Sequence, residues 1–386
     1  MSMRVLVIFG AAALYGMERG VIEIFDLLRP EVDPHFLISQ TPRRLGLPLF
    51  DEIENRKFKY SFLSDRKGWE RLGKPRSLSH LCKMLMGLVR GNLDALREVR
   101  RHDMLYVPNL FAAYYALLAM LYCRLTGRRV IYHFHDLYSS LSRQLRFLAF
   151  LFTDLVHNTN LGRQVVTDSN PYLRKKRNFV ISYPIRTMAP PANSNSPITD
   201  FGDKVNLVFV GQVSKHKGVD ILLDAFELLS KSRTDLVLHL VGGCEDPFLK
   251  SRIGDSNKGP LSKIKWWGYQ AEVAEFLRAA DVYVHPSLPS RFNESFGISV
   301  VEAMSLGKPI VCFRSGALPE IVIHKQIGLI CDQENPKALA ESIERLLCDR
   351  DLRNRYGQNA VGRYREEYSS ERIKSYWLRA IKANSG

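Results

Sequence analysis

The sequence lacks the long apolar runs and the cysteine patterns that mark several protein classes. Its longest apolar candidate, 111–123, is followed by Arg124 and falls short of the roughly 18–20 residues that a membrane-spanning helix needs. The 6 cysteines are scattered, and no two have the Cys-x-x-Cys spacing, which argues against a zinc cluster or a disulfide framework. The first residues lead directly into a β-type run without a signal-peptide pattern. We therefore expect a reducing, cytoplasmic compartment.

Negative charge is scarce in the first half of the chain. Residues 1–190 hold 29 lysines and arginines against 16 acidic residues, whereas residues 191–386 hold 26 against 24. Most of the net charge of +15 therefore lies in the first half, which predicts an anionic partner there: nucleic acid, phospholipid or a phosphorylated substrate. The basic runs contain no helix-turn-helix, zinc or RNA-binding motif, so we expect no nucleic acid.

A stretch rich in proline, asparagine and serine, 186–203, is typical of a linker. We accordingly expect a first domain over 1–190, a linker over 191–204, a second domain over 205–366 and a final helix over 367–386 that crosses back to the first domain.

Short β-branched runs alternate with helix-like segments on both sides of this linker, which indicates βαβ units and parallel sheets. The fold class is therefore α/β, with two doubly wound Rossmann-like domains facing each other across a cleft. Ligands of such sheets bind outside the carboxyl ends of the strands, so the residues after each strand are the candidates for a site. The predicted strands are 3–9, 35–39, 103–107, 129–134, 179–182, 205–210, 236–241, 263–268, 282–286, 309–313 and 328–331.

Two turns of the first domain follow predicted strands. The turn that ends at Gly16 lacks a full G-x-G-x-x-G, and taken alone a plain βα turn explains it better than a phosphate-binding one. His135 and Asp136 follow the strand 129–134. No further residue with metal-ligand spacing accompanies His135, so we favour a hydrogen-bonding role for it. We interpret His133 as a buried histidine whose ring nitrogens have partners.

In the second domain, Gly211 and Gln212 follow the strand 205–210, and a basic loop with Lys215 and Lys217 leads into a helix. A lysine beside free backbone N–H groups is suited to binding a pyrophosphate. The alternative is a solvated loop lysine.

Two glutamates, Glu294 and Glu302, lie eight positions apart around a predicted helix start at Ser295-Phe296-Gly297. A carboxylate here can accept hydrogen bonds from sugar hydroxyls, and the helix start can bind phosphate. Apolar neighbours surround Glu302, and a buried carboxylate needs a partner. A surface glutamate is therefore a poor explanation for it.

The D-x-D at 349–351 has a pattern that binds metal and nucleotide in other proteins. It lies between two helix-like segments, and we interpret Asp351 as a helix N-cap. We predict no metal site.

Taken in order, these motifs resemble the retaining glycosyltransferases of family 4, which have the GT-B architecture. The resemblance covers nearly the whole chain and is stronger in 205–345. Phosphatidylinositol mannosyltransferases are similar around N-E-S-F-G-I. The motifs are Gly16-Met17-Glu18-Arg19, His135-Asp136, G-Q-V-S-K-H-K-G at 211–218, the E-x7-E pair, and G-A-L-P-E at 316–320.

The resemblance implies that the second domain binds a nucleotide-diphosphate sugar and that the first binds the acceptor. His135 and Glu294 would act at the reacting sugar. The family usually has an arginine where this chain has Gln212, and Lys215 could supply the missing charge. The implied pyrophosphate contacts are Gly16, Gly211, Gln212, Lys215, Lys217, Phe296 and Gly297, and the implied sugar and ribose contacts are Asp136, Glu294, Ser295 and Glu302.

The activity implied is transfer of a hexose with retention and without metal or another cofactor. A UDP-sugar is the first candidate for the donor and GDP-mannose is the second. The expected acceptor is a glycan or a lipid-linked molecule in cell-surface polysaccharide or glycolipid synthesis. Two alternatives stay open: a nucleotide-sugar epimerase of the same architecture, and a non-catalytic sugar-nucleotide-binding relative, which Gln212 suggests.

The segment 76–101 predicts an amphipathic helix. Arg76, Lys83, Arg90 and Arg97 are seven positions apart and share one face, with leucines and Val89 on the opposite face. One interpretation places the apolar side on the core and the basic side in water. We favour the other, in which the basic face binds an anionic membrane, with about 1 kcal/mol per charge. The expected location is peripheral, on the inner face of the cell membrane.

Overall fold

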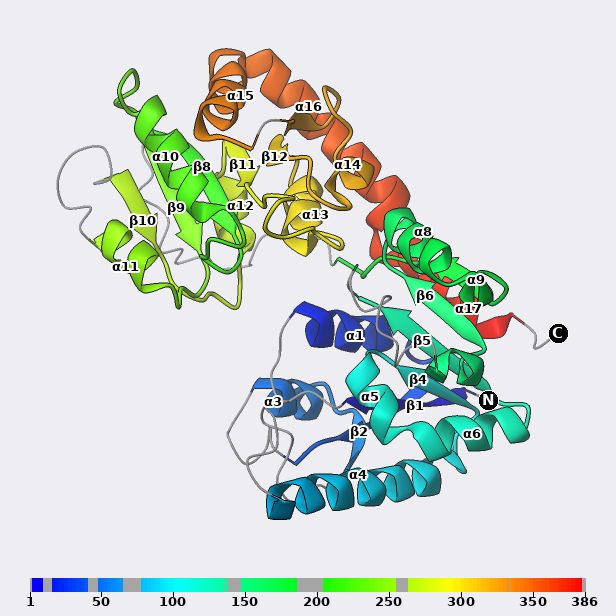
Figure 1. Ribbon diagram of the computed structural model, residues 1–386. Coiled ribbons are helices and arrows are strands. Elements are labelled where there is room, and N and C mark those ends of the chain that lie inside the picture. The colour runs from blue at the N-terminus through cyan, green and yellow to red at the C-terminus, as the bar shows by residue number, and fades with distance from the viewer. Residues whose placement is uncertain are drawn as a thin grey trace. The chain divides into compact units, whose positions relative to one another are not determined.

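The computed structural model describes residues 2–9, 16–40, 48–64, 78–135, 137, 147–185, 204–254, 263–332 and 334–383. They divide into two compact units (Figure 1). The first comprises Met1–Pro184 with Ile373–Gly386, and the second Ile185–Arg372. The predicted linker lies outside the described residues, except for Lys204.

The first unit contains a seven-stranded parallel sheet in the order β3-β2-β1-β4-β5-β6-β7. The chain order reverses between β1 and β4, which is where such sheets bind ligands. Two strands were not predicted, because β3 is a short polar edge strand and β6 carries a buried aspartate and histidine. The strands are β1 (Met3–Phe9), β2 (Val32–Ile38), β3 (Lys59–Phe62), β4 (Met104–Val107), β5 (Arg129–Phe134), β6 (Asp154–His157) and β7 (Arg177–Val180).

Helices connect these strands, and α4, α5 and α6 share a core with alternate residues of β4 and β5. The core residues of β5 are Val130, Tyr132 and Phe134, which alternate along the strand and so point to one face. The elements are α1 (Gly16–Leu27), α3 (Pro48–Asn55), α4 (Leu78–Val99), α5 (Leu110–Tyr115), α6 (Leu117–Leu125), η2 (Ala149–Leu151), α8 (Asn160–Ser169), α9 (Pro171–Arg174) and α17 (Ser370–Lys382).

The C-terminal end of α17 is bound to the first sheet by buried charge. Arg129 on β5 donates to the carbonyl oxygens of Ala380, at 2.8 Å, and Ile381. These are among the last carbonyls of the helix, which have no intrahelical partner. Asp154 on β6 accepts from Arg129 Nε at 3.0 Å and lies 2.6 Å from Arg177 Nε. The buried arginine is thus paired with a carboxylate and caps the helix at the same time.

The second unit contains a six-stranded parallel sheet in the order β10-β9-β8-β11-β12-β13. All six strands predicted for this half are present. They are β8 (Val205–Val210), β9 (Leu236–Val241), β10 (Ile264–Trp266), β11 (Val282–His285), β12 (Ile310–Phe313) and β13 (Gly328–Cys331). The helical elements are α10 (Val219–Leu229), α11 (Pro247–Gly254), α12 (Ala274–Ala279), α13 (Ile298–Ser305), α14 (Leu318–Ile321), α15 (Pro336–Cys348), α16 (Arg350–Arg363) and η4 (Tyr364–Tyr368).

The D-x-D is a helix start, but the predicted capping residue was wrong. Asp349, rather than Asp351, is the N-cap of α16, and its carboxylate accepts from the backbone N–H of Leu352 at 2.8 Å. Asp349 has the extended backbone of a cap, whereas Asp351 lies in the first turn of the helix, where an acidic residue is also favourable.

Candidate functional site

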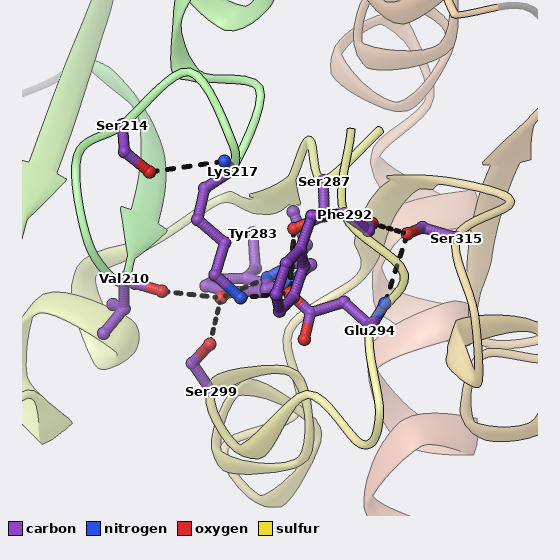
Figure 2. Close-up of polar contacts among 10 residues, drawn as sticks. Val210, Ser214, Lys217, Tyr283, Ser287, Phe292, Glu294, Ser299 and Ser315 are labelled. Atoms are coloured by element: carbon purple, nitrogen blue, oxygen red, sulfur yellow. Dashed lines mark hydrogen bonds and ion pairs between the residues drawn. The ribbon is translucent and has the colours of Figure 1, made fainter. Parts of the chain in front are cut away.

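The carboxyl ends of three neighbouring strands of the second sheet bring the candidate site together. Lys217 lies in the loop after β8, Ser287 and Glu294 follow β11, and Ser315 follows β12 (Figure 2). Because β8, β11 and β12 are adjacent and parallel, their following loops meet at one edge of the sheet.

Glu294 is at the centre of this group, and only 5% of its surface is exposed. Its Oε1 accepts three hydrogen bonds: from Lys217 Nζ, from His285 Nε2 at 2.9 Å and from Ser287 Oγ at 2.8 Å. Among the described residues, none donates to Oε2. One oxygen of the carboxylate is thus fully used by the protein, and the other is available to a ligand.

The electrostatic surroundings keep Glu294 ionised. Burial alone would raise the pKa of Glu294, but the neighbouring His285 and Lys217 outweigh it and hold that pKa well below its usual range. The carboxylate is therefore a permanent hydrogen-bond acceptor at neutral pH.

Tyr283 orients His285 for this contact. Its hydroxyl lies 3.2 Å from His285 Nδ1 and 2.8 Å from Ser299 Oγ, where α13 begins. Burial raises the pKa of Tyr283, and both Glu302 and Glu294 raise it further. Glu302, on the second turn of α13, is buried.

Two glycines allow the loops to approach each other closely. Gly218 has a φ of +69°, and a Cβ there would lie 1.9 Å from the carbonyl oxygen of Pro286. Gly316 has a φ of +49°, and a Cβ there would lie 2.1 Å from the carbonyl oxygen of Glu294. Only glycine fits either position without displacing the backbone that carries Glu294.

The start of α13 lies directly after Glu294. Gly297 is the N-cap, in the left-handed region with φ of 88°, and provides no side-chain cap. The first N–H groups of a helix have no intrahelical partner and attract anions. The predicted residues Ser295, Phe296 and Gly297 are thus placed at a helix start beside the buried carboxylate.

The basic loop after β8 has one residue at this centre and others outside it. Lys217 contacts Glu294, and its Nζ also lies 4.1 Å from the centroid of the Phe292 ring. Gln212 and Lys215 are exposed, and Lys215 Nζ lies 4.4 Å from the centroid of the Phe248 ring. The structure therefore groups Lys217 with Glu294 and leaves Gln212 and Lys215 at the surface.

In the first unit, His135 follows β5 and has one ring nitrogen occupied. Its Nδ1 is hydrogen-bonded to the hydroxyl of Tyr183, whereas the buried Nε2 has no partner within the described ranges. Burial lowers the pKa of His135, so the ring is neutral. Asp136 lies outside the described residues, and Gly16 is the first residue of α1.

His133 is a buried histidine with both ring nitrogens bonded, as predicted. Its Nδ1 lies 2.5 Å from the Tyr106 hydroxyl and its Nε2 lies 2.9 Å from Asn158 Oδ1. Burial lowers the pKa of His133 to about 3.

Sequence reasoning missed several residues that organise the site. His285 lies near the end of the predicted strand 282–286, and Ser287 directly follows that strand. Both could have been identified from the tendency of ligands to bind at the carboxyl ends of parallel strands. Tyr183, Tyr283 and Ser315 carry no motif and are identified only by their contacts: Ser315 Oγ, for example, donates to the Phe292 carbonyl at 2.7 Å.

The basic helix of the first unit differs from the expectation on its apolar side. Leu85 and Val89, assigned to the face opposite the basic residues, are 53% and 59% exposed. The interpretation in which the core covers that whole face is therefore wrong. Arg90 and Arg97 are exposed, Arg76 lies outside the described residues, and the side chain of Lys83 is not described.

Where α4 packs against α5, a glycine and an asparagine make the contacts instead of Leu85 and Val89. A Cβ on Gly91 would lie 2.4 Å from the Tyr115 ring, and Asn92 Nδ2 donates to the carbonyl of Tyr114 at 2.7 Å. Close approach of α5 therefore selects Gly91 and Asn92 for the interior. Across the described helices, none is both long and apolar enough to cross a membrane.

Most of the second unit is similar to a known protein family. Residues 194–363 match the family of glycosyl transferases group 1. The matched segment contains Lys217, Glu294 and Glu302.

Curated relatives match over a similar part of the chain. An uncharacterized glycosyltransferase of Methanocaldococcus jannaschii is 37% identical over 155 residues, 39% of this chain and 41% of the relative. The D-inositol 3-phosphate glycosyltransferase of Thermobifida fusca is 34% identical over 169 residues, 41% and 38% of the two chains. The phosphatidyl-myo-inositol mannosyltransferase of Mycobacterium leprae is 33% identical over 164 residues, 41% and 42%. The match to these relatives thus spans about two fifths of their length.

Solved structures match over nearly the whole chain. Anabaena HepE in complex with UDP and glucose has a TM-score of 0.75 and 17% identity, covering 99% of this chain and 100% of that one. A sucrose-phosphate synthase from Thermosynechococcus elongatus has a TM-score of 0.72 and 17% identity, covering 98% of each chain. With the two parallel sheets, these similarities confirm the predicted α/β fold class of two Rossmann-like domains, that of GT-B glycosyltransferases.

Proposed function

We propose that this protein is a retaining glycosyltransferase that moves a hexose from a nucleotide-diphosphate sugar to a glycan or lipid-linked acceptor. The observation that carries the proposal is the buried, ionised carboxylate of Glu294. Three donors hold its Oε1 in place, and none of the described residues donates to its Oε2. A fixed carboxylate oxygen at the carboxyl edge of a parallel sheet is suited to binding sugar hydroxyls.

The donor is assigned to the residues grouped around Glu294. Lys217 supplies positive charge for the diphosphate, and the N–H groups at the start of α13 add hydrogen-bond donors. Glu302 is assigned to the ribose. The further donor contacts that we propose are Gly16, Gly211, Gln212, Lys215, Phe296 and Gly297 for the pyrophosphate, and Asp136 and Ser295 for the sugar or ribose.

The proposed reaction breaks the bond between the anomeric carbon and the diphosphate oxygen and forms a bond from the same carbon to the acceptor oxygen on the same face. The acceptor proton passes to the departing diphosphate oxygen. His135, neutral because it is buried, is assigned a hydrogen-bonding position over the reacting sugar. The protein contributes positioning and stabilisation of the leaving negative charge. No step in this scheme uses a metal or another cofactor.

The identities of the donor and acceptor rest on similarity. UDP or UDP-glucose is present in solved structures with the same fold, and one relative is named a mannosyltransferase. We therefore place UDP-sugars first and GDP-mannose second. Relatives named for inositol phosphate and phosphatidyl-inositol acceptors support a glycan or lipid-linked acceptor.

A thermal-shift screen of UDP-, GDP- and ADP-sugars tests the proposal first, followed by proton NMR of the product formed from the donor that binds. We expect the product to keep the anomeric configuration of the donor, with EDTA present or absent. An inverted product would contradict the mechanism. Release of an epimerised sugar would favour the epimerase, and binding without any transfer would favour a non-catalytic relative.

A further inference from the structure

The core of the first unit covers only part of the apolar face of α4. Ala95 and Val99 are fully buried, whereas Leu85, Val89 and Leu93, four positions apart in turn, are 53%, 59% and 49% exposed. Residues four apart lie on one side of a helix, so these three form a continuous row of large apolar side chains facing solvent.

The neighbouring helix α6 has a similar row. Leu118, Leu121 and Leu125 are 38%, 43% and 79% exposed, and their spacing of three and four positions places them on one side. The helix is held by its other side, where Met120 and Cys123 are fully buried.

Contacts between the two helices join the rows. Asn92 on α4 accepts a hydrogen bond from the backbone N–H of Leu118 at 3.0 Å. Just beyond the end of α4, the guanidinium carbon of Arg100 lies 5.9 Å from the centroid of the Tyr122 ring on α6. Asn92 directly precedes Leu93 in the chain, and Leu118 is the first leucine of the α6 row. Figure 1 shows the two helices side by side. We call the surface formed by both rows the α4–α6 patch.

Positive charge borders this patch. Residues 78–128 contain seven lysines and arginines against three acidic residues. Arg90 and Arg97 are exposed on α4 along the row next to Val89 and Leu93, and Arg124 is exposed on α6. An apolar row beside a basic row is typical of helices that lie in the interface of an anionic membrane.

We propose that the α4–α6 patch inserts its leucines into the headgroup–acyl boundary of an anionic lipid bilayer, with the bordering arginines binding lipid phosphates. A twofold contact between two copies through the same patch would bring their arginines together, which is unfavourable. The proposal goes beyond glycosyl transfer, because it concerns a surface of the first unit. Its test needs no sugar donor, so its failure is distinct from failure of the proposed reaction.

Flotation of the full chain with vesicles tests the proposal. We expect the protein to float with phosphatidylcholine vesicles that contain phosphatidylglycerol, and not with phosphatidylcholine alone. The variant Val89→Ser/Leu93→Ser/Leu121→Ser removes apolar surface without changing charge and should lower binding roughly tenfold or more. Arg90→Gln/Arg97→Gln should weaken binding and reduce its dependence on salt. Leu228→Ser, an exposed leucine of the second unit, is the matched control and should float like the wild type.

A dye on residue 121 distinguishes insertion from surface attraction. In a chain with the exposed Cys82 and Cys348 replaced by serine, an environment-sensitive fluorophore on Leu121→Cys should shift to the blue on anionic vesicles. The same dye on Leu228→Cys should not. Thermal melts confirm that each variant is folded. Flotation of the triple serine variant equal to wild type would overturn the proposal. A wild-type dimer that does not float, and that the serine variant dissociates, would assign the patch to a second copy instead.

Discussion

Lys217 and Glu294, 77 positions apart in the chain, form an ion pair at the carboxyl edge of the second sheet. The pair joins the loop after β8 to the loop after β11, and the glutamate is the more buried partner, with its side chain 6% exposed against 22% for the lysine. A ligand that reaches the carboxylate therefore meets the ammonium group as well. This couples the two groups that we assign to the sugar and to the diphosphate.

Replacement of Glu294 tests the role of the carboxylate. Glu294→Gln keeps the size of the side chain but removes the charge that accepts hydrogen bonds from sugar hydroxyls. We expect a loss of about 2–3 kcal/mol of transition-state stabilisation, measured as kcat/KM with the true donor. The control Glu272→Gln changes an exposed carboxylate of the same unit and should leave kcat/KM unchanged. Turnover of Glu294→Gln within threefold of wild type would refute the assignment.

Replacement of Lys217 tests the diphosphate contact. Lys217→Ala should weaken binding of the nucleoside diphosphate by roughly 1.5–3 kcal/mol in calorimetry, the range for hydrogen bonds to charged groups. Gln212→Arg introduces the charge that is usual in the glycosyltransferases this sequence resembles and should leave the affinity unchanged or increase it. Lys231→Ala, at an exposed position after α10, should have no effect. An unaltered affinity in Lys217→Ala would show that this loop does not bind the diphosphate.

Acid should destabilise the protein through His133. Its pKa is lowered to about 3 by burial, below the value of about 6.5 in an unfolded chain. Between these two values the unfolded state binds the extra proton, so the free energy of unfolding falls as the pH falls from 6.5 toward 3. At pH 5 this amounts to about 2 kcal/mol relative to pH 7.

Urea unfolding at pH 7 and pH 5 measures this effect. His133→Gln should lose about 2 kcal/mol less between the two pH values than the wild type. The exposed His216→Gln should keep the pH dependence of the wild type. Equal pH dependence in the wild type and His133→Gln would show that the ring is not held neutral.

Removing Arg129 should destabilise the first unit and release the end of α17. Arg129→Met leaves the fully buried Asp154 with one fewer cation and removes the guanidinium donors from the carbonyls of Ala380 and Ile381. We expect a loss of about 3–5 kcal/mol in the free energy of unfolding, the range for one partner of a buried ion pair. Hydrogen exchange should rise first in α17.

The control for this prediction is the exposed pair of Arg174 and Asp168, whose side chains are 63% and 56% exposed. Arg174→Met should change stability little, because water solvates both charges. If Arg129→Met were as stable as Arg174→Met, the contacts of Arg129 would not be what keeps the end of α17 bound to the first sheet.

Much of the fold could be predicted from the sequence alone. The bounds predicted for β1, β5, β8, β9 and β13 are those observed, because parallel strands buried on both faces are continuous apolar runs. β3 and β6 have no such run. β6 contains Asp154 and His157, whose burial depends on partners from other strands: Arg129 and Arg177 for the aspartate, Asn178 for the histidine.

The candidate site, like the fold, could be predicted from the sequence only in part. Its glycines, Lys217 and Glu294 were identifiable because each lies in a loop after a predicted strand, where ligands of parallel sheets bind. Glu302 was identifiable because a carboxylate among apolar neighbours needs a partner. Only the tertiary structure decided that Lys217, His285 and Ser287 bond to the same oxygen of Glu294, because the loops that carry them follow different strands. It also decided which side of α4 is buried: the sequence determined an amphipathic helix, but close approach of Tyr115 placed Gly91 in the interior and left Leu85 and Val89 in solvent.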